Sequence, residues 1–417
     1  MKLEIIKKLK DTVNHLYQDH LYRNSFYLIL SNVIVGITGF LFWLIAARFY
    51  SPEDVGLAVA LISAMTLFMV FSASGFNPAF IKFLPSMSSE ERNELISTLF
   101  LFSIIISAIL YFVFILFIDF FAPKLYILTS PEYSLIFIFS VIFLDIFLLM
   151  NGIFTSNRKS DFLFVKNTIQ GISRLIFLPF FVFVGVMGIF ISTTISLVIA
   201  LFFSLFLLLR IYPTLRICFN MKILKNAFAF ISANYISTIF LQLPNLLFPI
   251  IILNALSEAD VAYFYIPWQL FFVFFVIITV INSAFLMEGS HDERDIEKHK
   301  RKTIKLSFLV VFGGIILFFI FGEFLLSLFG KEYIDSTNLL YVLAISLIPL
   351  VINQIYLTIK LIKKGVKEFT VLSVIIYSSS LIIGTILIPY FGIIGVGYGW
   401  LIGQMIGVVW IVVKKFR

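Results

Sequence analysis

The chain has 417 residues, of which 61% are hydrophobic and only 13% are charged, and its mean hydropathy is +1.06. A soluble domain is roughly half apolar and a quarter charged, and a single aqueous core stops growing at about 250 to 300 residues. These values exclude one soluble globular domain and indicate that lipid surrounds most of the chain. The net charge of +8 needs no nucleic-acid partner, because basic loops beside an anionic leaflet account for it.

Twelve apolar runs are long enough to cross a hydrocarbon core about 30 Å thick, which takes about 20 helical residues. They predict an all-α integral membrane protein. Short turns that contain glycine, between spans five and six and between spans eleven and twelve, leave the count open from about ten to fourteen. The predicted spans are 24–49, 56–83, 94–118, 134–154, 163–187, 189–211, 227–253, 262–287, 304–329, 337–359, 369–389 and 392–413.

The basic residues give a separate test of this topology. If the amino terminus is cytoplasmic, 27 of the 31 Lys and Arg residues fall on the cytoplasmic side. Arg48, Lys124 and Lys331 fall on the opposite side, and Arg174 lies inside a span. The positive-inside rule then predicts that both termini are cytoplasmic and that the protein lies in the cell membrane.

The ends and loops hold no predicted enzyme or metal centre. Residues 1–23 place apolar residues at helical spacing among charges, which predicts an interfacial amphipathic helix and not a removable signal peptide. The single cysteine, Cys218, excludes an intramolecular disulfide and any multi-cysteine metal site. Because the outer loops are short and hold few ionisable groups, we predict no catalytic residues, no metal and no cofactor.

Two similar stretches stand in the two halves of the chain. "RFYSPEDVGLAVA" contains Ser51, and "NALSEADVAYFYI" contains Ser257, with an acid three residues after each serine. This spacing predicts helix caps at the starts of spans two and eight. Six spans separate the copies, which predicts a parallel duplication. The predicted domains are the helix at 1–23, a six-helix bundle at 24–211, a cytoplasmic linker at 212–226 and a second six-helix bundle at 227–417, related by pseudo-two-fold symmetry.

Polar residues form stripes on two equivalent spans. Two interpretations are open: hydrogen bonds between packed helices, worth about 0.6 to 2 kcal/mol each, or a polar cavity between the halves. Span seven carries Asn234, Thr238, Gln242 and Asn245, and span one carries Asn24, Ser31 or Asn32, and Thr38 or Gly39.

Three charged residues are predicted to lie inside the membrane. Asp145 in span four and Arg174 in span five have opposite signs on neighbouring spans, so they either pair with each other or take part in ligand binding or ion coupling. Glu323 in span nine is the other embedded acid. Asp145 and Glu323 are therefore the candidates for coupling to a Na⁺ or H⁺ gradient.

The stretches "AARFYSPEDVGLAVALISAM" and "SGFNPAFIKFLPSMSSEERNELISTLF" resemble the polysaccharide transporter family of lipid-linked oligosaccharide flippases. In that family the first outer loop is similar to A-R-x-L-x-P-x-x-[FY]-G. Here Val55 replaces the usual aromatic residue before Gly56, and Lys82 stands where arginine is frequent. The resemblance implies the fold of the multidrug exporters, and export of an isoprenoid phosphate- or pyrophosphate-linked glycan by alternating access.

Such a substrate needs cations for its phosphate and amides or hydroxyls for its sugars. The cationic candidates are Arg23, Lys82, Lys166 and Arg174, and the polar candidates are Asn32, Asn77, Asn234, Gln242 and Asn245. A drug or metabolite antiporter of the same fold, with a smaller pocket and a buried carboxylate, is the alternative. A membrane glycosyltransferase would need a cleft lined by acids, which the sequence does not favour. The expected partners are the lipid-linked substrate and membrane lipids, with the protein acting as a monomer, alone or with glycan-assembly proteins.

Overall fold

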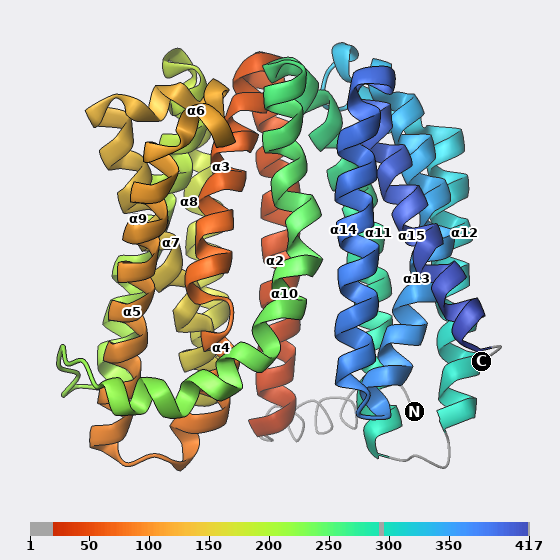
Figure 1. Cartoon of the computed structure of the whole chain (residues 1–417). Coiled ribbons are helices and arrows are strands. Elements are labelled where there is room, and N and C mark those ends of the chain that lie inside the picture. The colour runs from red at the N-terminus through yellow and green to blue at the C-terminus, as the bar shows by residue number, and fades with distance from the viewer. Residues whose placement is uncertain (1–19, 292–295, 416–417) are drawn as a thin grey trace, which may run out of the picture. The chain divides into compact units, whose positions relative to one another are not determined.

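The computed structural model describes residues 20–291 and 296–415. Most of the predicted amphipathic helix, residues 1–19, lies outside the described residues. Within the described ranges every regular element is a helix (Figure 1), which confirms the all-α prediction. Eleven of these helices are long and apolar enough to cross a membrane, so the protein is a multi-pass membrane protein.

Each predicted span corresponds to a long helix. The elements of the first half are α2 (His20–Phe49), α3 (Pro52–Ala73), α4 (Phe76–Phe83), η1 (Leu84–Ser86), α5 (Ser89–Leu116), α6 (Ile118–Phe121), η2 (Pro123–Thr129), α7 (Pro131–Ser156), α8 (Ser160–Phe180), η3 (Val182–Val184) and α9 (Val186–Ile211). Those of the second half are α10 (Met221–Ala255), α11 (Glu258–His291), α12 (Ile296–Ser327), η5 (Lys331–Ser336), α13 (Thr337–Ile362), α14 (Val366–Phe391) and α15 (Ile393–Lys415).

Two spans differ from a simple apolar helix. The second is divided at Ser74 and Gly75 into α3 and α4, where Gly75 and the nearby Pro78 weaken the helical hydrogen bonding. The fifth, α8, is not among the eleven apolar helices, because Lys166, Arg174 and several amides lower its hydropathy.

The chain divides into two compact units. Unit 1 holds the described residues 20–42, 68–116 and 128–235, and unit 2 holds residues 43–67, 117–127, 236–291 and 296–415. The division places the first turns of α3 in unit 2, together with the end of α2.

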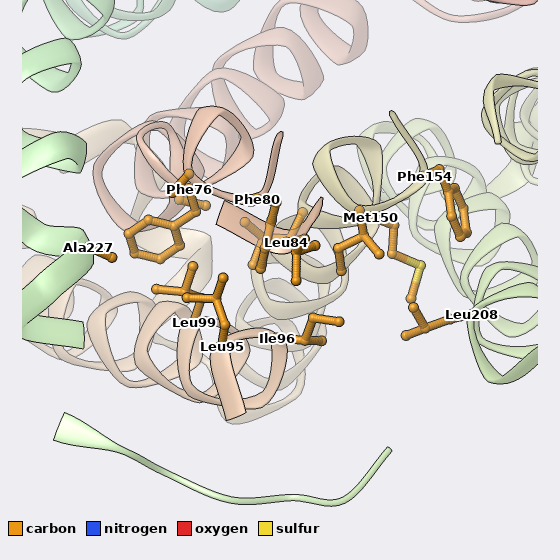
Figure 2. Close-up of a cluster of buried hydrophobic side chains, with 14 of the residues drawn as sticks. Phe76, Phe80, Leu84, Leu95, Ile96, Leu99, Met150, Phe154, Leu208 and Ala227 are labelled. Atoms are coloured by element: carbon orange, nitrogen blue, oxygen red, sulfur yellow. The ribbon is translucent and has the colours of Figure 1, made fainter. Parts of the chain in front are cut away.

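Unit 1 has an apolar cluster that fixes the short helix α4. Phe76 and Phe80 of α4 pack among Leu95 and Leu99 of α5 and Met150 of α7 (Figure 2). The first part of α10 belongs to this unit and runs crosswise to its helices (Figure 1). It contributes further residues to the same cluster, among them Leu224, Ala227 and Ile231.

In unit 2 the last two helices pack at backbone contact. A Cβ atom added at Gly399 of α15 would lie 2.2 Å from the Cα of Gly384 in α14, and one at Gly403 would lie 2.1 Å from the Ser380 hydroxyl oxygen. Only residues without a side chain allow this approach. Gly392, in the left-handed region at φ +57°, makes the tight turn between the two helices.

The two predicted caps are confirmed, and both lie in unit 2. Ser51 Oγ accepts the Asp54 backbone N–H at 3.2 Å, and Ser257 Oγ accepts that of Asp260 at 3.2 Å. Each serine hydroxyl also bonds the carboxylate of the same acid, at 3.2 and 2.6 Å. The caps start α3 at Pro52 and α11 at Glu258.

Candidate functional site

A buried carboxylate lies inside unit 1. Asp145 of α7 is 0% exposed. The Ser72 hydroxyl of α3 lies 2.9 Å from each carboxylate oxygen, and Ser103 and Ser107 of α5 bond Oδ2 at 2.8 and 2.5 Å. Ser103 and Ser107 are one helical turn apart, so both face the acid. Three hydroxyl donors stabilise a carboxylate that would otherwise be costly to bury.

The predicted pairing of Asp145 with Arg174 is wrong. Within the described chain the partners of the Asp145 carboxylate are hydroxyls. The Arg174 guanidinium lies over the Phe42 ring at 4.1 Å. Carboxylate and hydroxyl oxygens are the ligands that a hard cation or a proton takes. Asp145 and its three serines, here called the Asp145 cluster, bring such oxygens together inside unit 1, and the coupling role of Asp145 stays a prediction.

Lys166 of α8 is the most deeply placed cation of the described chain, at 0% exposed. Its ammonium donates to the Phe147 carbonyl oxygen at 2.9 Å and lies 3.3 Å from the centre of the Phe147 ring. A carbonyl and a cation–π contact offset part of the desolvation cost of the charge. In this conformation Lys166 faces protein, so a ligand reaches it only if α7 and α8 separate locally.

Lys82 of α4 is the accessible counterpart. Its side chain is exposed, and its ammonium lies over the Phe230 ring at 4.0 Å and near the Phe83 ring at 5.2 Å. The rings hold the charge in place without neutralising it. Arg23, at the start of α2, is partly exposed. Among the described residues, no contact joins it to Lys82 or Lys166.

The polar stripe of α2 packs against α8. The Asn24 Oδ1 atom accepts the Ser160 backbone N–H at 3.4 Å, and the Asn167 amide donates to the Ser31 hydroxyl at 2.8 Å. One turn further, Gly171 lies directly against the Thr38 side chain. In each contacting pair the α2 residue and the α8 residue are separated by nearly the same number of positions, so the two helices run in the same direction. The first and fifth spans of the predicted topology do so too. For this stripe the interpretation as helix packing is confirmed.

Two predicted polar residues of unit 1 have different surroundings. The Asn77 Oδ1 atom accepts the Gly152 backbone N–H at 2.9 Å and joins α4 to α7. Asn32 is exposed on α2. The side chain of Asn234 lies outside the described residues, and Glu323 is exposed on α12. The substrate and coupling roles of these four residues stay predictions.

The polar stripe of α10 lines a cavity inside unit 2. The cavity has a volume of about 150 Å³. Asn245 Oδ1 accepts the Trp268 indole N–H at 2.7 Å, which fixes the position of both side chains. We call this space the aromatic cavity; its lining residues are Thr238, Leu241, Gln242, Pro244, Asn245, Trp268, Phe271, Phe272, Phe275 and Trp400.

The comparison with known families settles where this arrangement belongs. A family model described as "Polysaccharide biosynthesis protein" matches residues 21–287, well over half of the chain. The chain belongs to the polysaccharide biosynthesis protein family. The resemblance read from the first 120 residues is thereby confirmed at family level.

One curated protein and several solved structures resemble the chain along most of its length. The capsular polysaccharide biosynthesis protein CapF of Staphylococcus aureus is 26% identical over 408 residues, which cover 93% of this chain and 97% of CapF. The inward closed structure of the lipid II flippase MurJ matches with a TM-score of 0.76 at 18% identity, over 94% of this chain and 87% of MurJ. An inward-facing multidrug resistance MATE transporter of the MOP superfamily matches with a TM-score of 0.70 at 16% identity, over 92% of both chains. The predicted multidrug-exporter-like fold is confirmed.

Two residues of the stretch "AARFYSPEDVGLAVALISAM", which resembles the family's first outer loop, have structural roles in unit 2. Arg48 donates from Nε to the Leu328 carbonyl at 2.6 Å and from Nη2 to the Ser327 carbonyl at 3.0 Å, so it caps the carboxyl end of α12. A Cβ atom at Gly56 would lie 1.7 Å from the Glu258 carbonyl oxygen. Only glycine lets the start of α3 pack directly on the start of α11.

The sequence prediction missed the partners of these sites. Ser72, Ser103 and Ser107 look like ordinary small residues of apolar helices, although the four-residue spacing of the last two is a signal. Trp268 and Trp400 are separated by 132 positions and show no periodic relation to the α10 stripe. Only packing brings them to Asn245.

Proposed function

We propose that this protein is a flippase that exports isoprenoid phosphate- or pyrophosphate-linked oligosaccharide across the cytoplasmic membrane for the assembly of cell-surface glycan. Both termini lie in the cytoplasm, and transport proceeds by alternating access of two six-helix bundles. The observation that carries the proposal is membership of the polysaccharide biosynthesis protein family, in a chain made of membrane-spanning helices. CapF and MurJ, named for capsular polysaccharide and for lipid II, support the same substrate class.

The cations of unit 1 suit the phosphate end of this substrate. Lys82 is exposed and lies over the Phe230 ring, so it provides a first contact for phosphate oxygens. Arg174, over Phe42, and buried Lys166 provide later contacts when the helices around them move. Arg23 adds positive charge at the start of α2. The amides of Gln242 and Asn245 suit the sugar end.

Reconstitution tests this function. Full-length protein is placed in proteoliposomes with a fluorescent isoprenoid pyrophosphate-linked oligosaccharide, and movement between leaflets is followed by dithionite quenching. We expect wild-type protein to flip this lipid. Lys82→Ala should slow flipping about tenfold or more, because one charge-assisted contact is worth about 1.5 to 3 kcal/mol. Lys331→Ala, at an exposed lysine of η5, is the matched control and should leave the rate unchanged.

The outcomes separate the roles. Equal rates for wild type, Lys82→Ala and Arg174→Ala would refute the phosphate-binding roles while leaving the flippase function in place. If no lipid-linked glycan moves but aromatic cations are extruded, the protein is an antiporter instead.

The second candidate, a cation-coupled drug or metabolite antiporter, draws on the Asp145 cluster. A buried carboxylate with three hydroxyls is a site for Na⁺ or H⁺. The cluster can couple either substrate class to an ion gradient, so it bears on the energy source and not on the cargo. Asp145→Asn removes the charge and keeps the size of the side chain.

Rates measured with and without imposed Na⁺ and pH gradients test this coupling. We expect Asp145→Asn to abolish the gradient dependence. Asp119→Asn, at an exposed acid of α6, serves as the control and should keep it. Loss of the dependence in Glu323→Gln, with Asp145→Asn unaffected, would move the coupling role to α12.

A further inference from the structure

The aromatic cavity of unit 2 is sized for a single ring. Its volume is about 150 Å³, whereas pockets for drug-sized ligands occupy roughly 300 to 1,000 Å³. A chain of sugars does not fit in it. The cavity is largely walled by aromatic side chains, of which Trp268, Phe271 and Trp400 are at most 3% exposed.

The polar groups of the cavity are hydrogen-bonding groups without charge. None of the described residues that line it is charged. Asn245 uses its Oδ1 atom for the Trp268 indole, which leaves the Nδ2 amide as a donor. Gln242 adds a second amide. Gln242 and Asn245 therefore supply the amide groups of the cavity lining.

This set of groups matches one chemical class. A pyranose ring has apolar C–H faces that pack on aromatic rings, and hydroxyls or an acetamido group that accept from and donate to amides. A uronate or phosphate would lose hydration here without gaining a cation. An aromatic cation would find rings but, among the lining residues, no carboxylate. The chemistry therefore favours a neutral sugar.

We infer that the aromatic cavity binds one uncharged pyranose ring of the glycan, packed on Trp268 and Trp400 and hydrogen-bonded to Gln242 and Asn245. The inference rests on the proposed flippase function and names the part of the substrate that unit 2 recognises. The cations of unit 1 would bind the phosphate end of the substrate, as proposed above.

Binding of free glycosides tests the cavity without any transport. Full-length protein in nanodiscs is titrated with methyl glucoside, methyl N-acetylglucosaminide, methyl glucuronide and tetraphenylphosphonium. Tryptophan fluorescence is the readout, since two of the four tryptophans line the cavity. We expect a saturable change with at least one neutral glycoside and weaker binding of the glucuronide.

Substitutions locate the signal. Trp400→Leu removes an aromatic ring on which the sugar packs, so the affinity for the neutral glycoside should fall about three- to tenfold. Gln242→Leu removes an amide partner and should lower the affinity by a similar factor. Trp410→Leu is the control, because Trp410 packs on Tyr356 outside the cavity, and its affinity should equal that of the wild type.

Several results would overturn the inference. These are no saturable response to any neutral glycoside, equal affinities in Trp400→Leu and Trp410→Leu, or binding of tetraphenylphosphonium that glycosides do not displace. The flipping assay on the same preparations distinguishes failure of the cavity inference from failure of the proposed flippase function. Flipping without glycoside binding refutes the cavity alone, whereas glycoside binding without flipping of lipid-linked glycan refutes the flippase function.

Discussion

Equivalent polar stripes on α2 and α10 have different surroundings. On α2, Ser31 and Thr38 face α8, where Asn167 and Gly171 meet them at hydrogen-bond and van der Waals distance. On α10, Gln242 and Asn245 line the aromatic cavity. The same residue types at the same helical spacing thus hold two helices together in unit 1 and border open space in unit 2.

The neighbouring helix decides which role a stripe takes. α8 offers amides and a glycine at matching turns, so it can approach α2 and satisfy its polar groups. α11 offers Trp268, Phe271 and Phe275, whose rings are too large for close approach. A stripe that meets small residues becomes an interface, and one that meets large rings borders a cavity. The predictions below test this difference.

The largest effect is expected at the α2–α8 contact. In Gly171→Ala the new Cβ atom would lie 2.5 Å from the Thr38 Oγ1 atom, so one helix must shift. We expect a loss of stability of about 1 to 3 kcal/mol, measured as thermal unfolding in detergent. Gly36→Ala is the matched control, because a Cβ atom at Gly36 meets nothing within 4 Å. Equal stability of both variants would contradict close packing of α2 on α8.

A medium effect is expected for the hydrogen bond between Ser31 and Asn167. A double-mutant cycle of Ser31→Ala and Asn167→Ala should give a coupling energy of about 0.6 to 1.7 kcal/mol, the range for interhelical bonds in membranes. The same cycle with Asn32→Ala should give no coupling, since Asn32 is exposed on the same helix. A measurable coupling energy between Asn32 and Asn167 would contradict the prediction, because it would mean that the face of α2 that carries Asn32 packs against α8.

The smallest effect on stability is expected at Gln242. Gln242→Leu should change the unfolding free energy by less than about 0.5 kcal/mol, because the side chain borders the aromatic cavity. Asn245→Leu is the comparison. It leaves the Trp268 indole without its 2.7 Å acceptor and should cost about 1 to 3 kcal/mol. If Gln242→Leu costs as much as Asn245→Leu in a thermal unfolding experiment, then the Gln242 amide has a structural role and does not serve a ligand.

Particular residues show how far sequence reasoning extends. Gly75 marks the break between α3 and α4, and Ser51 and Ser257 mark helix starts. Both features can be recognised in the sequence because a helix break or cap depends only on residues a few positions apart. The Asp145 prediction was half right. The embedded acid was found, but the opposite charge of Arg174 on the next span suggested a partner that the packing does not supply.

The class of the protein, the positions of its spans and its family can be predicted from the sequence, because hydropathy, helical periodicity and the first-loop motif are local properties of the chain. The positions of Ser72, Ser103 and Ser107 around Asp145, and of Trp268 and Trp400 in one cavity with Gln242, depend on how the helices pack. These residues lie on helices distant in sequence. Which faces of such helices meet depends on the size of every side chain between them.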